Sequence, residues 1–204
     1  MRRFLVSVSP ETAVFAPLIG IVIGTFGGAV YWLAVQLWPT SVAVILSMAA
    51  AAILAEIPGG PTTRSEFLTR VFYLLIKYNA LMALSAAKLP FAVPANLALG
   101  LIMICGFAAS YALIVAVITI RPDKPAARVS SGTLALALLV GFVPAALLGI
   151  PGLIGLAAAI IAVMGIIVSL RYQGAGASSA ALGMTQLGAE LCFYLGALAS
   201  WSYV

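Results

Sequence analysis

About seven runs of apolar residues, each near twenty residues long, alternate with short polar or proline-rich segments along this 204-residue chain. The hydrocarbon core of a bilayer is about 30 Å thick, and an α-helix needs roughly 20 apolar residues to cross it. The pattern therefore predicts an all-α fold, a polytopic transmembrane helix bundle of about seven helices, in a single integral membrane domain over residues 1–204. The predicted spans are Ala13–Leu37, Ser41–Ile57, Phe67–Lys88, Ala95–Ile120, Gly132–Leu148, Leu153–Leu170 and Ala181–Tyr203.

The shortest predicted connection is Gly149-Ile150-Pro151-Gly152, between the fifth and sixth spans. Glycine and proline together favour a tight turn and end a helix on either side. The sequence allows two interpretations of this segment. In one it joins two complete spans, and in the other it is the tip of a re-entrant hairpin.

The basic residues indicate which way the chain crosses the membrane. With the N-terminus in the cytoplasm, seven spans put eight Lys and Arg residues on the cytoplasmic side, and Lys88 alone on the other. Cytoplasmic loops of membrane proteins carry such an excess of positive charge. We therefore predict a cytoplasmic N-terminus, a C-terminus on the opposite side, and a location in the bacterial cytoplasmic (inner) membrane. The cytoplasmic residues are Arg2, Arg3, Arg64, Arg70, Arg121, Lys124, Arg128 and Arg171.

The composition agrees with a membrane location and excludes several kinds of catalytic and metal site. The chain is 64% hydrophobic and 7% charged, with no His and only five acidic residues. The lack of His excludes His-based metal sites and His-dependent triads. We predict no catalytic residue, no metal site and no cofactor. The net charge of +5 is explained by topology, so no nucleic-acid partner is expected.

Four polar residues lie inside predicted spans. Ionisable groups at such positions are energetically unfavourable in lipid and often have a function. Lys77 and Asn79 belong to the third span, and Gln186 and Glu190 to the seventh. A Lys77–Glu190 pair would neutralise both charges as an interhelical tie. The alternative is a proton or ligand site, and the sequence does not say whether the two helices touch.

The loop that contains Arg121, Lys124 and Arg128 is the most polar part of the chain. Such a cluster is a candidate contact for anionic lipid headgroups or a phosphate. Ordinary determination of topology explains these charges equally well.

Gly20, Gly24 and Gly28 follow one another at intervals of four in the first span. Small residues at this spacing let two membrane helices approach closely, so we predict a helix-packing face. The alternative is a groove that receives a lipid or a partner helix.

The order of several motifs resembles the cobalamin synthase family, the adenosylcobinamide-GDP ribazoletransferases of the membrane. The segment Pro17–Gly24 is similar to the Pro-Leu-x-Gly-x-x-x-Gly stretch that opens these enzymes. Leu75–Leu81 resembles their third helix, and Ala109-Ser110 before an apolar run is similar too. A Gly-rich loop followed by Leu182-Gly183 and Gln186 resembles their last motif. The resemblance covers most of the chain in order.

The chain departs from this family at the ionic positions. The family pattern His-x-Asp-Gly-x-x-Asp, whose carboxylates are expected to bind a divalent metal and substrate phosphate, is replaced by Glu56–Pro61. Its Ser-Arg becomes Ser110-Tyr111, and its Thr-Gly-Asp becomes Ser178-Ser179-Ala180. Phosphoalcohol transfer depends on charge stabilisation of phosphate oxygens. These departures predict that transferase activity has been lost.

The leading hypothesis is a non-catalytic, cobalamin-synthase-like membrane protein, acting as a structural or accessory subunit of a membrane complex. Its partners would be the lipid bilayer and other membrane subunits or further copies of itself. One alternative is a divergent Mg²⁺-dependent ribazoletransferase that uses Glu56, Glu66 and the basic loop. Another is a small transporter or lipid-binding carrier with Lys77 and Glu190 at its polar centre.

Overall fold

A computed structural model describes residues 13–55, 64–86, 95–120, 129–172 and 179–201. Within these ranges the chain is helical and contains no strand, which confirms the predicted all-α class. One 3₁₀ turn, η1 (Ala13–Phe15), precedes seven α-helices. They are α2 (Ala16–Ala34), α3 (Thr40–Ala55), α4 (Arg64–Ser85), α5 (Ala95–Ile120), α6 (Ser131–Leu147), α7 (Ile150–Tyr172) and α8 (Ser179–Trp201).

Four of these helices are long and apolar enough to cross a membrane. The qualifying segments are Ala16–Ala34, Phe67–Ser85, Leu97–Ile120 and Ile150–Tyr172. The helices α3 and α6 are equally apolar but shorter, with 16 and 17 residues. Each predicted span corresponds to one helix, while the passage of all seven through the bilayer stays a prediction.

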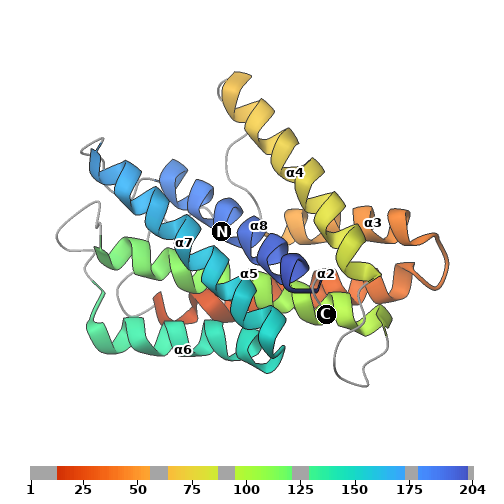
Figure 1. Cartoon of the computed structure of the whole chain (residues 1–204), viewed down its shortest axis with the longest axis horizontal. Coiled ribbons are helices and arrows are strands. Elements are labelled where there is room, and N and C mark those ends of the chain that lie inside the picture. The colour runs from red at the N-terminus through yellow and green to blue at the C-terminus, as the bar shows by residue number, and fades with distance from the viewer. Residues whose placement is uncertain (1–12, 56–63, 87–94, 121–128, 173–178, 202–204) are drawn as a thin grey trace.

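Helix α5 forms the centre of the bundle (Figure 1). Of its most apolar stretch, 78% is buried inside the protein, against 28% for α4 and α7. The neighbours of α5 are α2, α6 and α8, and α7 packs mainly on α8. A helix that is apolar on all sides is expected in this central position.

Glycines on α2 permit very close contact with α5. A Cβ atom added at Gly24 would lie 2.5 Å from Ile104 Cα, and one at Gly28 would lie 2.8 Å from Gly100 Cα. At Gly20 the added atom would lie 2.5 Å from the Phe107 carbonyl oxygen. All three glycines are buried. Their shared face is therefore occupied by α5, which leaves it closed to lipid or a partner helix.

The connection between α6 and α7 is a tight turn at Leu148 and Gly149. The Leu148 amide donates to the Ala145 carbonyl at 3.1 Å, and the Gly149 amide donates to Ala146 at 3.0 Å. Gly149 has φ 70°, a left-handed conformation that favours glycine. Helix α7 then begins at Ile150, three residues before the predicted start of the sixth span, because proline at the second helical position is well tolerated.

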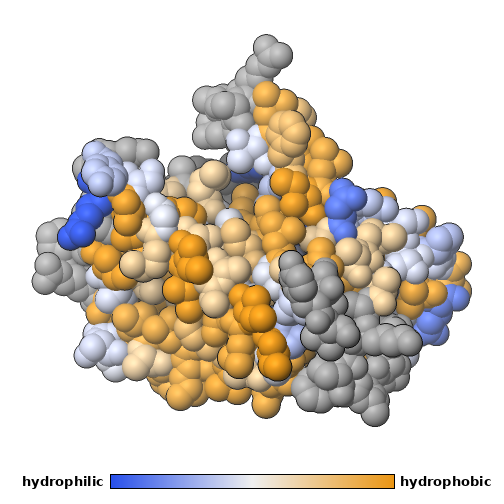
Figure 2. All heavy atoms as spheres, viewed as in Figure 1, coloured by the Kyte–Doolittle hydropathy of each residue, from blue (hydrophilic) through white to orange (hydrophobic). Residues whose placement is uncertain are grey.

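Large apolar side chains also cover the exterior. Figure 2 shows hydrophobic residues over most of the visible face, with hydrophilic residues gathered toward its two ends. Exposed side chains include Val22, Ile53, Phe72, Leu139 and Ile161. Apolar exposure on this scale suits a protein whose solvent is lipid.

Candidate functional site

A charged cluster lies inside the bundle where α4 meets α8. The Lys77 Nζ atom is 2.6 Å from Glu190 Oε1, and the two side chains are only 5% and 1% exposed. The structure therefore brings together the two ionisable residues that the sequence placed inside separate spans. A charge in an apolar interior needs a partner of this kind, because desolvation otherwise disfavours it by several kcal/mol.

Two tyrosine hydroxyls complete the partners of the Glu190 carboxylate. Tyr73 donates to Oε2 at 2.8 Å, and Tyr194 donates to Oε1 at 3.0 Å. Tyr73 precedes Lys77 by four residues on α4, and Tyr194 follows Glu190 by four on α8. Residues four apart share one face of a helix, so each helix contributes two members to the same contact.

Aromatic rings surround the Lys77 ammonium. Its nitrogen lies 4.7 Å from the centroid of the Phe107 ring, 5.7 Å from that of Tyr73 and 5.9 Å from that of Tyr194. A cation within about 6 Å of an aromatic face is attracted by the electron density of the ring. The rings thus supply some of the stabilisation that water would give elsewhere.

We call these five residues the Lys77–Glu190 cluster: Tyr73, Lys77, Phe107, Glu190 and Tyr194. Helix α5 provides the Phe107 ring and, at Gly106, room for the ring of Tyr194. A Cβ atom at Gly106 would lie 2.5 Å from Cε1 of the Tyr194 ring. Glycine at this position therefore allows Tyr194 to lie against α5 with its hydroxyl directed at Glu190.

The cluster is electrically neutral, and its polar atoms are used within it. Both carboxylate oxygens accept hydrogen bonds from tyrosines, and one also faces the ammonium. Throughout the described part of the chain, no buried side-chain nitrogen or oxygen lacks a partner. This arrangement suits an interhelical tie, in which each group satisfies another.

The other polar residues predicted within spans, Asn79 and Gln186, make different contacts. Gln186 is half-buried one turn before Glu190, and its side chain interacts with the hydroxyl of Tyr111 on α5. Asn79 is exposed and donates from Nδ2 to the Leu75 carbonyl of its own helix at 2.8 Å. Asn79 is therefore a local feature of α4 rather than a member of the buried site.

The predicted loop residues Arg121, Lys124 and Arg128 lie outside the described residues, and so does Glu56. Within the described ranges, no group of three His, Cys, Asp or Glu side chains is close enough to hold a metal ion.

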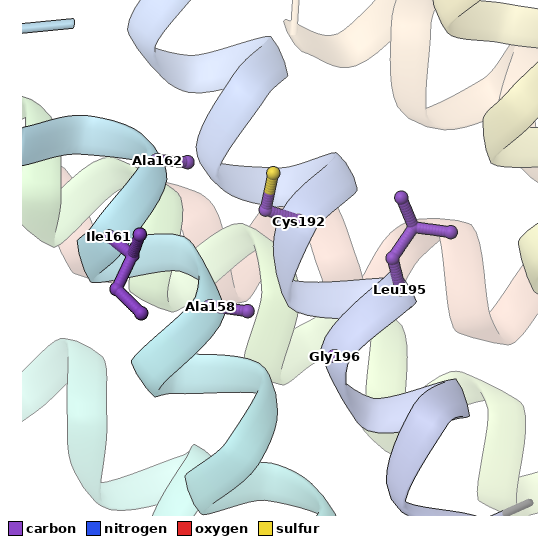
Figure 3. A pocket seen from close by; sticks show the side chains of 6 residues that line it. All are labelled: Ala158, Ile161, Ala162, Cys192, Leu195 and Gly196. Atoms are coloured by element: carbon purple, nitrogen blue, oxygen red, sulfur yellow. The ribbon is translucent and has the colours of Figure 1, made fainter. Parts of the chain in front are cut away.

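A second candidate site is an open apolar groove between α7 and α8 (Figure 3). Its only side chain with a heteroatom is the thiol of Cys192. A groove of this composition suits an acyl chain or another helix, and it offers little to a reaction. Its lining residues are Ala158, Ile161, Ala162, Cys192, Leu195 and Gly196.

Sequence reasoning missed the aromatic members of the Lys77–Glu190 cluster. Tyr73 and Tyr194 carry a detectable signal, because each lies one helical turn from an ionisable residue. Phe107 carries none, since it is one apolar residue among many on α5.

Comparisons with protein-family models, curated proteins and solved structures found no match to this chain.

Proposed function

We propose that this chain is a non-catalytic accessory subunit of a membrane complex, built on a cobalamin-synthase-like scaffold in the inner membrane of a bacterium. All seven helices enter the bilayer, with the N-terminus in the cytoplasm and the C-terminus on the opposite side. The observation that carries the proposal is the Lys77–Glu190 cluster, the buried charge of the described bundle, in which each charged group is paired.

Location in the membrane is supported by the exterior of the bundle. Lipid-facing helices need apolar side chains outside as well as inside, and the exposed residues of α2, α4, α6 and α7 fit this need. The one-sided distribution of Lys and Arg supports the orientation.

A structural role is supported by how the cluster is built. A catalytic acid or base needs a path to a substrate proton. Here the Glu190 carboxylate pairs with the Lys77 ammonium and accepts hydrogen bonds from Tyr73 and Tyr194. Its side chain is only 1% exposed. The paired carboxylate holds α4 and α8 together. Transfer of a proton between Glu190 and a substrate would require the ion pair with Lys77 to open.

The resemblance to cobalamin synthases supports the scaffold, and the departures from it support the loss of activity. The whole sequence holds a single Asp, at position 123, where the family uses several carboxylates to hold metal and phosphate. The competing proposal, a divergent Mg²⁺-dependent ribazoletransferase, keeps Glu56 and Glu66 for this task.

The decisive experiment is purification of the tagged chain from its native membranes in a mild detergent, with the protein mass measured by light scattering. We expect a mass well above the 21.0 kDa of one chain, from other membrane subunits or further copies. A solitary monomer would contradict the accessory role. In parallel, Mg²⁺-dependent turnover of a cobinamide nucleotide by the pure protein would establish the enzyme alternative.

A further inference from the structure

The turn between α6 and α7 does not reach the end of the bundle at which α2 ends and α5 begins. Figure 1 shows it stopping well short of the ends of both helices. Two independent sets of contacts fix its level along α5.

The first set comes from α6. Gly141 packs against Ala108 and Ala112 of α5, which runs antiparallel to it. Leu148 lies seven residues beyond Gly141, whereas Ala95 lies about fifteen residues beyond the contact on α5. At 1.5 Å per residue, the turn therefore ends roughly 12 Å before the start of α5.

The second set comes from α7 and α8. Gly155 packs on Phe193, and the neighbouring Tyr194 packs on Gly106 of α5. Ile150 is five residues from Gly155, and Ala95 is eleven from Gly106. This path gives a shortfall of roughly 9 Å, close to the first value.

This end of the bundle carries the aromatic residues expected at a membrane surface. Gly28 faces Gly100, so Trp32, one turn further on α2, lies level with the first turn of α5. Trp32 and Trp38 are both exposed. Tryptophan is enriched at the boundary between lipid and water, so the α6–α7 turn lies about 10 Å beneath that boundary.

The composition of the turn agrees with that depth. Every side chain from Leu134 to Val168 is apolar, and Leu147 and Ile150 at the turn are 73% and 68% exposed. The connection between α2 and α3, at the aromatic end, carries Gln36 and Trp38 instead. In addition, the turn amides of Leu148 and Gly149 find carbonyls within the protein, as lipid requires.

We infer that α6 and α7 form a re-entrant hairpin whose tip, residues 147–150, ends among lipid acyl chains inside the bilayer. This inference rests on the proposed membrane location. Lipid acyl chains then fill the space beyond the tip. The orientation is unchanged, because both outer ends of the hairpin stay on the cytoplasmic side.

Site-directed spin labelling in lipid bilayers tests this inference. Cys105 and Cys192 are first replaced by Ala, and one cysteine is introduced per variant. Leu147→Cys reports on the tip. Leu37→Cys, 74% exposed in the α2–α3 connection, is the water-side control, and Ile161→Cys, 72% exposed on α7, is the lipid-side control. Collision with molecular oxygen, which concentrates in lipid, is compared with collision with a water-soluble nickel chelate.

We expect the label at position 147 to favour oxygen over the chelate several-fold more than the label at 37, as the label at 161 does. A label at 147 that meets the chelate as readily as the one at 37, while 161 stays in lipid, would overturn the hairpin alone. A label at 147 that meets neither reagent would show a protein covering the tip, and would overturn lipid as the occupant. Chelate access at 161 would instead overturn the membrane location itself.

Discussion

Removing the charges of Lys77 and Glu190 one at a time should destabilise the protein more than removing both. Lys77→Met leaves a carboxylate without its cation, and Glu190→Gln leaves an ammonium without its anion. Each side chain is at most 5% exposed, so water does not replace the lost partner. A buried charge left unpaired lowers the free energy of unfolding by about 3 kcal/mol, and we expect this from each single variant.

The double variant Lys77→Met/Glu190→Gln leaves no unpaired charge. The glutamine amide would keep an oxygen for the tyrosine hydroxyls, and the methionine fits among aromatic rings. The ammonium faces one carboxylate oxygen at 2.6 Å, and the negative charge is shared with the second oxygen. Unit charges at a mean separation of about 4 Å attract by about 4 kcal/mol at an effective dielectric constant of 20. We expect a coupling energy of this size, so the double variant should lose only about 2 kcal/mol.

The assay is reversible unfolding in mixed micelles of increasing dodecyl sulfate content, followed by the fluorescence of the three tryptophans. Asn79→Ala is the matched control on the same helix, because Asn79 is exposed and bonds only within α4. It should change stability by less than about 0.5 kcal/mol. Additive losses in the double variant would refute the reasoning, because they would show that the two charges do not stabilise each other.

Other variants test the packing and the orientation. Gly24→Ala should destabilise by about 1–3 kcal/mol in the same unfolding assay, because its Cβ would meet Ile104, whereas Gly165→Ala, with open space around it, should be neutral or slightly stabilising. Ser47→Ala should lose about 0.5–1 kcal/mol, since its buried hydroxyl donates to the Gly27 carbonyl at 2.9 Å; an unchanged midpoint would contradict this. A phosphatase that folds only outside the cytoplasm should be active when fused to the C-terminus and inactive at the N-terminus, and the reverse result would contradict the orientation.

The sequence was sufficient to predict where the helices lie. Proline and glycine end apolar runs sharply, so the predicted spans coincide with α2 to α8 to within a few residues. The level at which the α6–α7 turn lies cannot be predicted from the sequence, because it depends on how α6 packs against α5 and how α7 packs against α8.

The candidate site was predictable only in part. Lys77 and Glu190 stand out because charge is rare inside apolar spans. Their contact joins helices more than a hundred residues apart, and no local pattern encodes which helices become neighbours. Asn79 has the same sequence signal as Lys77, yet the helical rotation of two residues places it outside the cluster.

The α2–α5 contact and the α4–α8 contact hold helices together in different ways. Because lipid is as apolar as the helices, burial from water cannot draw them together inside a bilayer. Helix α2 meets α5 through glycines that bring the backbones into contact. Helix α4 has no buried side chain between Phe67 and Phe72, so it has little close packing to hold it over that stretch. Its position depends on its C-terminal half and on the Lys77–Glu190 cluster. Acyl chains can replace apolar packing but offer no ionic or hydrogen-bond partner, so the ion pair favours contact between α4 and α8 over contact with lipid.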